Sequence, residues 1–166
     1  MGDAVDVILG QWAAERPDLD ARPMAVIGRI ARVHHLLDRG VAENLARHGL
    51  QRWEFDVLAT LRRHRGGPLT AGELAAAMMV ASASMTNRID RLVTRGFVSR
   101  TVDPSSRRRV LISLSDAGRA LVDEVVSTHV AAEDRLLAGL DEGERAGLAD
   151  LLRRLLLSLG DRPEAP

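Results

Sequence analysis

The chain has 166 residues, contains no cysteine, and carries 23 basic and 23 acidic residues, so its formal net charge is zero. This length suits one domain with a sizeable core, and the missing thiols exclude structural disulfides and thiol-based oxidant sensing. No apolar run approaches the roughly 20 residues of a membrane span, and the acidic start lacks the layout of a signal peptide. We therefore expect a cytoplasmic protein with no membrane partner.

Three helices are predicted before residue 66. Apolar residues at helical spacing indicate a short first helix that ends before Pro17 and carries Trp12. A longer helix over 24–48 ends at Gly49, and a third covers 51–65. The apolar face comprises Val5, Ile8, Leu9 and Trp12 in the first helix and Val26, Ile30, Val33, Leu37, Val41 and Leu45 in the second, and the inward residues of the third are Trp53, Val57 and Leu61.

Two short helices joined by a tight turn follow. Thr70 and Glu73 form a capping box that starts a helix through Met78. After a turn near 79–81, a helix over 82–95 has one apolar face and one polar, basic face. Such an amphipathic second helix is typical of a helix-turn-helix that places it in the major groove of DNA. The expected buried residues are Met85, Ile89, Leu92 and Val93, and the candidate base or phosphate contacts are Ser82, Ser84, Thr86, Asn87, Arg88, Arg91 and Arg95.

A β-hairpin is predicted next. Residues 97–102 and 110–114 alternate and are rich in β-branched side chains, and the turn-rich segment 103–109 between them ends in three arginines. A basic tip suits the narrow, electronegative minor groove. We interpret the hairpin as a wing with four candidate DNA-binding residues, Asp103, Arg107, Arg108 and Arg109.

Two apolar helices close the chain. Ser115 can cap a helix over 116–137, and a last helix follows Gly143 with a leucine stripe that Arg153 and Arg154 interrupt. The stripe spans more than half of the helix circumference, which is more apolar surface than one small core absorbs. We therefore expect a homodimer, with a wide intramolecular face as the alternative. The stripe comprises Leu148, Leu151, Leu152, Leu155, Leu156 and Leu159.

Charge is unevenly distributed along the sequence. Residues 82–109 hold seven arginines and two acids, whereas residues 110–166 hold six arginines and eleven acids. Opposite patches let one end of the protein attract phosphate while the other stays clear of it. All basic residues are arginine, so the number of arginines carries no functional weight by itself.

Three short motifs surround the predicted hairpin: Asp103 with Arg107-Arg108, the run Arg91-Leu92-Val93-x-Arg95-Gly96, and Leu114-Ser115-x-x-Gly118. With these motifs the chain resembles, over nearly its whole length, the MarR family of winged-helix transcription factors. The family usually has a second acid before the paired arginines, where this chain has Ser106.

The resemblance implies a mainly α fold with a small β-hairpin wing. One domain over 1–166 would contain a winged helix-turn-helix at 51–114 and a helical dimerisation region at 1–48 and 115–160. It also implies double-stranded DNA as a partner, self-association, and repression of a divergent neighbouring gene.

Asp56 and Arg63 lie seven residues apart on the predicted third helix, so they share a face and can flank a bound molecule. With Trp12 and Arg88 they resemble the set in the urate-responsive branch of the family, the PecS- and HucR-like regulators. The resemblance implies that these four residues bind urate or a purine-like anion. Tryptophan offers such a planar anion a flat contact, and arginine offers a planar fork of donors.

Several alternatives stay open. The ligand can be another small anion, or there is none, in which case Trp12 is a core anchor and Arg88 binds phosphate. His34, His35 and the pair His129–Glu133 suggest a metal, but no cysteine or acid cluster completes a set. Enzyme motifs are lacking, and a winged-helix module that binds only proteins is the rival class. We expect a non-enzymatic regulator with no cofactor apart from its effector.

Overall fold

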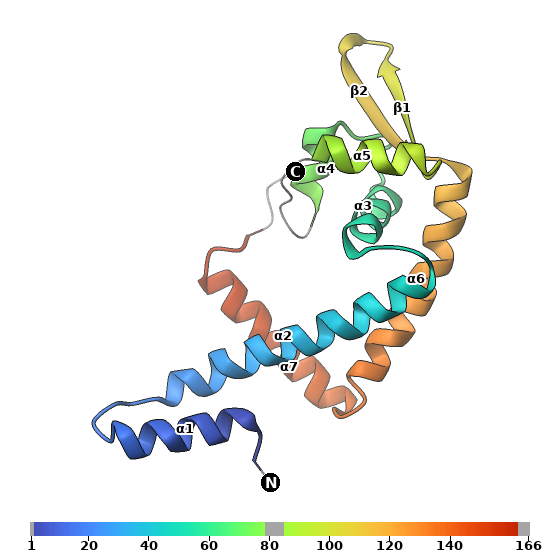
Figure 1. The fold of residues 1–166 in the computed structure, drawn as a ribbon. Coiled ribbons are helices and arrows are strands. Elements are labelled where there is room, and N and C mark those ends of the chain that lie inside the picture. Colours follow the sequence, from blue (N-terminus) through green and yellow to red (C-terminus); the bar gives the residue numbers. More distant parts are fainter. Residues whose placement is uncertain (1, 79–84, 163–166) are drawn as a thin grey trace.

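The computed structural model describes residues 2–78 and 85–162, and within them the chain forms seven helices and one antiparallel hairpin (Figure 1). The expected mainly α fold with a small β-hairpin is confirmed. The elements are α1 (Ala4–Glu15), α2 (Arg22–Arg47), α3 (Arg52–Arg63), α4 (Ala71–Ala77), α5 (Met85–Thr94), β1 (Val98–Asp103), β2 (Ser106–Leu114), α6 (Asp116–Leu136) and α7 (Glu142–Ser158).

The core joins the segment from α3 to β2, called the winged unit below, to the long helices α2 and α6. It contains the C-terminal half of α2, the inner faces of α3, α4 and α5, the start of β1, the end of β2, and α6. Figure 1 shows the winged unit at one end of the molecule and α1 at the other, beside the first turns of α2. The side chains that are fully enclosed include Leu45, Val57, Leu58, Leu74, Ile89, Leu92, Ile112, Val122 and Val125.

Local signals fix the boundaries of the winged unit. The capping box at the start of α4 is present, because Thr70 N donates to Glu73 Oε2 at 2.7 Å and Glu73 N donates to Thr70 Oγ1 at 3.3 Å. Gly96 ends α5 with φ of +75°, the left-handed conformation that glycine adopts without strain. The expected turn at 79–81 and the residues 82–84 lie outside the described part of the chain.

The wing is longer and tighter than the sequence indicates. Its second strand begins at Ser106, not at Val110, so the arginines that we expected in a loop belong to β2. The register pairs Val98 with Leu114 and Asp103 with Ser106, with an irregularity after Val102. The turn is short because Asp103 Oδ1 accepts hydrogen bonds from both the backbone N and the Oγ of Ser105, at 2.8 and 2.7 Å.

Several predicted inward residues are exposed in the single chain. Val93 on α5 is 37% exposed, because the buried face of α5 is narrower than expected and centres on Met85, Ile89 and Leu92. The first half of α2 and all of α7 also expose apolar side chains, and α7 has no buried residue. None of the described helices is long and apolar enough to cross a membrane. The exposed stripes are Val26, Ile30 and Val33 on α2 and Leu148, Leu151, Leu152, Leu156 and Leu159 on α7.

Candidate DNA-binding and effector sites

Helix α5 turns a polar face to solvent. Thr86, Asn87 and Arg91 are exposed, on the side away from the buried Met85, Ile89 and Leu92. This arrangement agrees with the predicted polar and apolar faces. Ser82 and Ser84, the other two predicted contacts at the start of this helix, lie outside the described residues.

Trp53 of α3 holds two arginines of α5, a contact that the sequence analysis missed. The guanidinium carbon of Arg88 lies 5.3 Å from the centre of the indole ring, and that of Arg91 lies 5.0 Å from it. Both distances suit a cation–π interaction. The indole Nε1 donates to the side chain of Gln51, which keeps the ring in place between α3 and α5.

Arg95 differs from its predicted place on the DNA-facing side of α5. Its guanidinium points to α3, where Nη1 donates to Glu54 Oε1 at 2.7 Å, and it lies 4.8 Å from the centre of the Phe97 ring. The reason is geometric: Arg88 and Arg95 are seven residues apart and share the flank of α5 that meets α3. Glu54 was not predicted as a functional residue, although it stands three residues before Val57 on the apolar face of α3.

The wing arginines have different surroundings. Arg108 and Arg109 are both exposed, but Arg109 also has acidic partners, with Nη2 donating to Glu73 Oε1 at 3.2 Å and Nε lying 3.7 Å from Asp103 Oδ2. The side chain of Arg107 lies outside the described part. Hydrogen bonds from Ser105 lower the pKa of Asp103, and Arg109 adds to this effect. Asp103 therefore shapes the turn and orients Arg109 although position 106 is a serine.

A second ion pair ties the wing to the candidate recognition helix. Arg100 on β1 donates to the Asp90 carboxylate of α5 and, at 3.4 Å, to the carbonyl of Thr86. Neither Asp90 nor Arg100 was singled out in the sequence, because an acid on a basic helix resembles ordinary surface charge. The pair links the hairpin to α5.

Asp56 is the centre of the predicted effector site. Its side chain on α3 is half-buried, and this burial raises the pKa of its carboxyl, while the charges of Arg52, Arg63, Arg88 and His129 act in the opposite direction. Arg63 and Arg88 are thus near enough to Asp56 for their charges to act on its carboxyl. A carboxylate surrounded by guanidinium groups leaves a net positive site for an anion.

Arg63 also contacts the helix-turn-helix directly. Its Nη2 donates to the carbonyl of Ala77 at 2.8 Å, in the last turn of α4. Residue 63 therefore connects α3, where Asp56 lies, with the end of α4. An anion that draws the guanidinium away would remove this contact.

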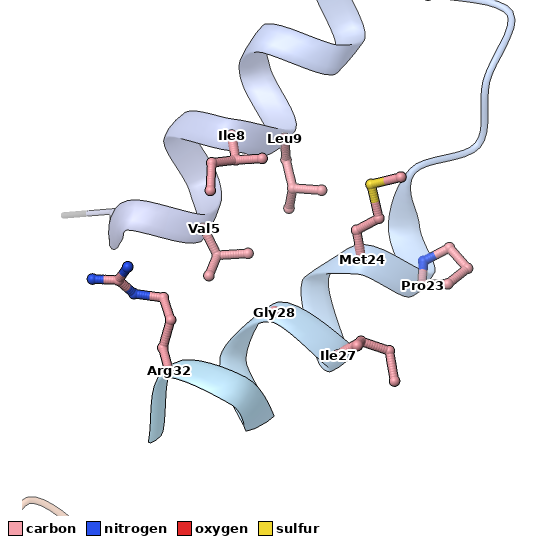
Figure 2. A pocket seen from close by; sticks show the side chains of 8 residues that line it. All are labelled: Val5, Ile8, Leu9, Pro23, Met24, Ile27, Gly28 and Arg32. Atoms are coloured by element: carbon pink, nitrogen blue, oxygen red, sulfur yellow. The ribbon is translucent and has the colours of Figure 1, made fainter. Parts of the chain in front are cut away.

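Trp12 is not brought to the other three residues within one chain. It is 40% exposed on α1, which packs against α2 at the end of the molecule opposite α3 (Figure 1). A separate apolar pocket of about 460 Å³ lies between α1 and α2. Figure 2 shows side chains that line it, among them Val5, Leu9 and Met24. The pocket's one charged lining residue is Arg32, and Trp12 does not line it.

The histidines form no metal centre in the described residues. His129 Nε2 lies 3.2 Å from Glu133 Oε1, and its ring packs on Phe55, while His34 and His35 are exposed. No group of three potential ligands comes together among residues 2–78 and 85–162.

The fold and these sites define a winged helix-turn-helix protein of the transcription-regulator class. Residues 50–110 match the MarR family. The HTH-type transcriptional regulator PecS of Dickeya dadantii is 41% identical over 153 residues, which cover 91% of this chain and 92% of PecS. The chain therefore belongs to the MarR family, resembles its PecS-like branch, and is a regulator rather than an enzyme.

Solved structures of relatives have the same fold. A mutant of Escherichia coli MarR complexed with operator DNA has a TM-score of 0.70 at 26% identity, covering 93% of this chain and 99% of that chain. Bordetella bronchiseptica BpsR, described as regulated in its DNA binding by 6-hydroxynicotinic acid, has a TM-score of 0.69 at 28% identity, covering 78% and 91%.

Proposed function

We propose that the protein is a dimeric repressor that binds a pseudo-palindromic operator and is released from it by urate or a related planar anion. The observation that carries the proposal is the half-buried Asp56 on α3 among Arg52, Arg63 and Arg88, the last of which lies on the helix that would read DNA. Because its operator is chromosomal, we place the protein in the cytoplasm.

For DNA, α5 is the recognition helix and the hairpin is the wing. Its exposed Asn87 and Arg91 are suited to base edges in the major groove, and Arg107 and Arg108 to the minor groove and its phosphates. In a dimer the two recognition helices enter successive major grooves about 34 Å apart. The operator complex of the MarR relative supports this arrangement.

The exposed apolar helices support the dimer. In the described part of the chain, α7 and one face of the first half of α2 expose apolar side chains although α1 packs on the first turns of α2, and a second copy would cover them. When the first halves of two antiparallel α2 helices pack across a twofold axis, the start of each lies beside the middle of the other. This packing carries the partner's α1 toward α3, and in the proposal the partner's Trp12 completes the site at Asp56.

Release follows from differential affinity. Urate is a planar anion that suits the guanidinium groups of Arg63 and Arg88, and only a ligand that favours the DNA-incompetent state drives release. Binding to Arg63 competes with its hydrogen bond to Ala77, and binding to Arg88 competes with Trp53. Both changes act on the helix-turn-helix.

Footprinting and mobility shift with the region upstream of its own gene test DNA binding. We expect protection of two half-sites by a dimer, and loss of base preference in Asn87→Ala and Arg91→Ala. A monomer that protects no DNA at micromolar concentration would overturn the proposal and favour a protein-interaction module.

Titration of the protein–DNA complex with urate tests the effector. Arg63→Ala should need far more urate for release while its DNA affinity stays near the parent value, and Asp56→Asn should bind urate but release DNA poorly. Arg62→Ala is the matched control, because Arg62 is the neighbouring arginine and pairs with Asp123 on α6. Release of the Arg63 variant at the parent's urate concentration would exclude this site as the sensor.

Mixed dimers test whether Trp12 acts across the dimer. If it does, a mixed dimer of one Trp12→Ala chain and one Arg63→Ala chain retains one intact site. The homodimer of either variant alone has no intact site. If Trp12 acts within its own chain, the mixed dimer has no intact site.

A hydroxylated nicotinate is the second candidate effector. It is also a planar anion, and the BpsR relative is described as regulated by 6-hydroxynicotinic acid. Thermal-shift measurements with urate, other purines and 6-hydroxynicotinate separate the candidates, since the preferred ligand stabilises most at equal concentration.

A further inference from the structure

The best-enclosed ion pair of the winged unit joins Glu54 on α3 to Arg95 at the end of α5. The Glu54 side chain is 3% exposed and that of Arg95 is 35% exposed, with Nη1 and Oε1 2.7 Å apart. By contrast, the ion pairs of α3 with the long helices are more exposed: Arg62–Asp123 is 43% and 48% exposed, and Arg52–Asp38 is 47% exposed at both partners. A buried carboxylate is costly unless its oxygens are satisfied, so this pair is a specific arrangement.

Both partners also bind the segment between α2 and α3. Arg95 Nη2 donates to the carbonyl of Gly49 at 3.1 Å, and Glu54 Oε2 accepts from the backbone N of Gln51 at 2.8 Å. Gly49 has φ of +65°, which turns the chain out of α2. One guanidinium thus links the end of α5 to the joint between the long helix and the winged unit.

The flat face of the Arg95 guanidinium also has a partner. It lies over the ring of Phe97, whose backbone N donates to Leu92 at 3.0 Å. Position 95 is therefore fixed by a carboxylate, a carbonyl and an aromatic ring, which together restrain the last turn of α5. Lysine offers one point charge and cannot reproduce this fork of contacts.

We propose that Arg95 is a positioning residue, which acts through Glu54 to hold the recognition helix at a fixed angle to α2 and so sets the spacing of the two helices in the dimer. This inference rests on the proposed role of α5 in DNA reading. Glu54 is too buried to touch DNA, so any effect of its substitution on operator binding passes through Arg95 or the packing of α3.

Operator affinity of Glu54→Gln, Arg95→Gln and the double variant, measured across a salt series, tests the proposal. A tilted recognition helix loses base contacts in both half-sites, so each single variant should bind about tenfold weaker or more. The double variant should be no worse than either single variant, and the salt slope should stay at the parent value. A direct phosphate contact by Arg95 predicts instead a slope lower by about one for each lost contact, or about two for the dimer, with Glu54→Gln binding as tightly as the parent.

A second measurement uses operators with one base pair added or removed between the half-sites. The parent should discriminate strongly against the altered spacing, and Glu54→Gln should discriminate less. Arg62→Gln and Asp123→Asn, which remove the same charges from the exposed pair on α3, should keep the parent's spacing preference.

Arg95→Lys keeps both charges and tests the proposal even if Glu54→Gln fails to fold. Weak binding with an unchanged salt slope in this variant supports positioning. Parent-like affinity and spacing preference would overturn it. If Asn87→Ala and Arg91→Ala bind every sequence like the parent, the recognition role of α5 fails, and that outcome is separate from these.

Discussion

Gly118→Ala should destabilise the protein because no space exists for a methyl group at the start of α6. A Cβ at this position would lie 1.9 Å from the carbonyl oxygen of Phe97 and 2.8 Å from its carbonyl carbon, both backbone atoms that cannot rotate away. The helix must therefore move by more than an ångström, which strains the hydrogen bond from Ser115 N to Phe97 O, now 3.1 Å.

Overpacking of this kind costs about 1–3 kcal/mol, and the lost hydrogen bond adds about 1 kcal/mol. Alanine recovers about 0.5–1 kcal/mol through its higher helix propensity. We expect a net loss of about 2–3 kcal/mol, which lowers Tm by about 4–12 °C in a chain of this size.

Thermal unfolding followed by circular dichroism, at one fixed protein concentration because dimerisation affects Tm, measures this loss. Gly72→Ala in α4 is the control, since nothing lies within 4 Å of a Cβ there. A Gly118→Ala protein as stable as the parent would show that the start of α6 is not packed tightly against the Phe97 carbonyl.

Three further predictions concern charge and association. Burial raises the pKa of Asp56 above the ordinary 3.8, so the folded state disfavours its ionised form. Asp56→Asn should therefore stabilise the protein at pH 7, as measured by thermal unfolding. At pH 4.5 the gain in stability should be smaller, because a larger fraction of Asp56 is already protonated in the folded state. Arg108→Ala should weaken binding to all DNA sequences similarly and reduce the salt slope by about one per lost phosphate contact. An unchanged slope with altered sequence preference would show instead that Arg108 reads bases. Leu152→Glu with Leu156→Glu should yield monomers in analytical ultracentrifugation, whereas Val102→Glu, an exposed apolar position on the wing, should stay dimeric.

The helices and the wing could be predicted from the sequence because their signals are local. The capping box at Thr70, the left-handed Gly96 and the cap at Ser115 each act within a few residues, and each is present as expected. The family motif around Gly118 also has a physical basis in the structure, namely the close approach to Phe97.

The partners of the charged side chains could not be predicted, because they depend on how distant elements pack. Nothing near Arg95 in the sequence indicates that it meets Glu54, which is 41 residues away. A signal was available on α3, where Glu54 stands on the same face as Val57, Leu58 and Leu61. An acid in an apolar stripe indicates a buried carboxylate with a cation beside it. Trp12 differs from Glu54 and Arg95. The family resemblance assigns it to the effector site, but within one chain it lies far from the other three residues of that site.

Three arginines of α5 and its C-terminal end contact side chains of other elements and give that helix two kinds of support. Arg88 and Arg91 rest on the Trp53 ring, and each such contact is worth about 0.5–2 kcal/mol, whereas Arg95 is held by a buried carboxylate, a carbonyl and an aromatic ring. Arg88 and Arg95 are seven residues apart, about 10 Å along the helix axis. An anion beside Asp56 competes for the weaker support at Arg88 and leaves the stronger one at Arg95 in place. Effector binding would therefore turn α5 about its C-terminal end instead of shifting it as a whole, which moves Asn87 and the start of the helix farthest from their places in the major groove.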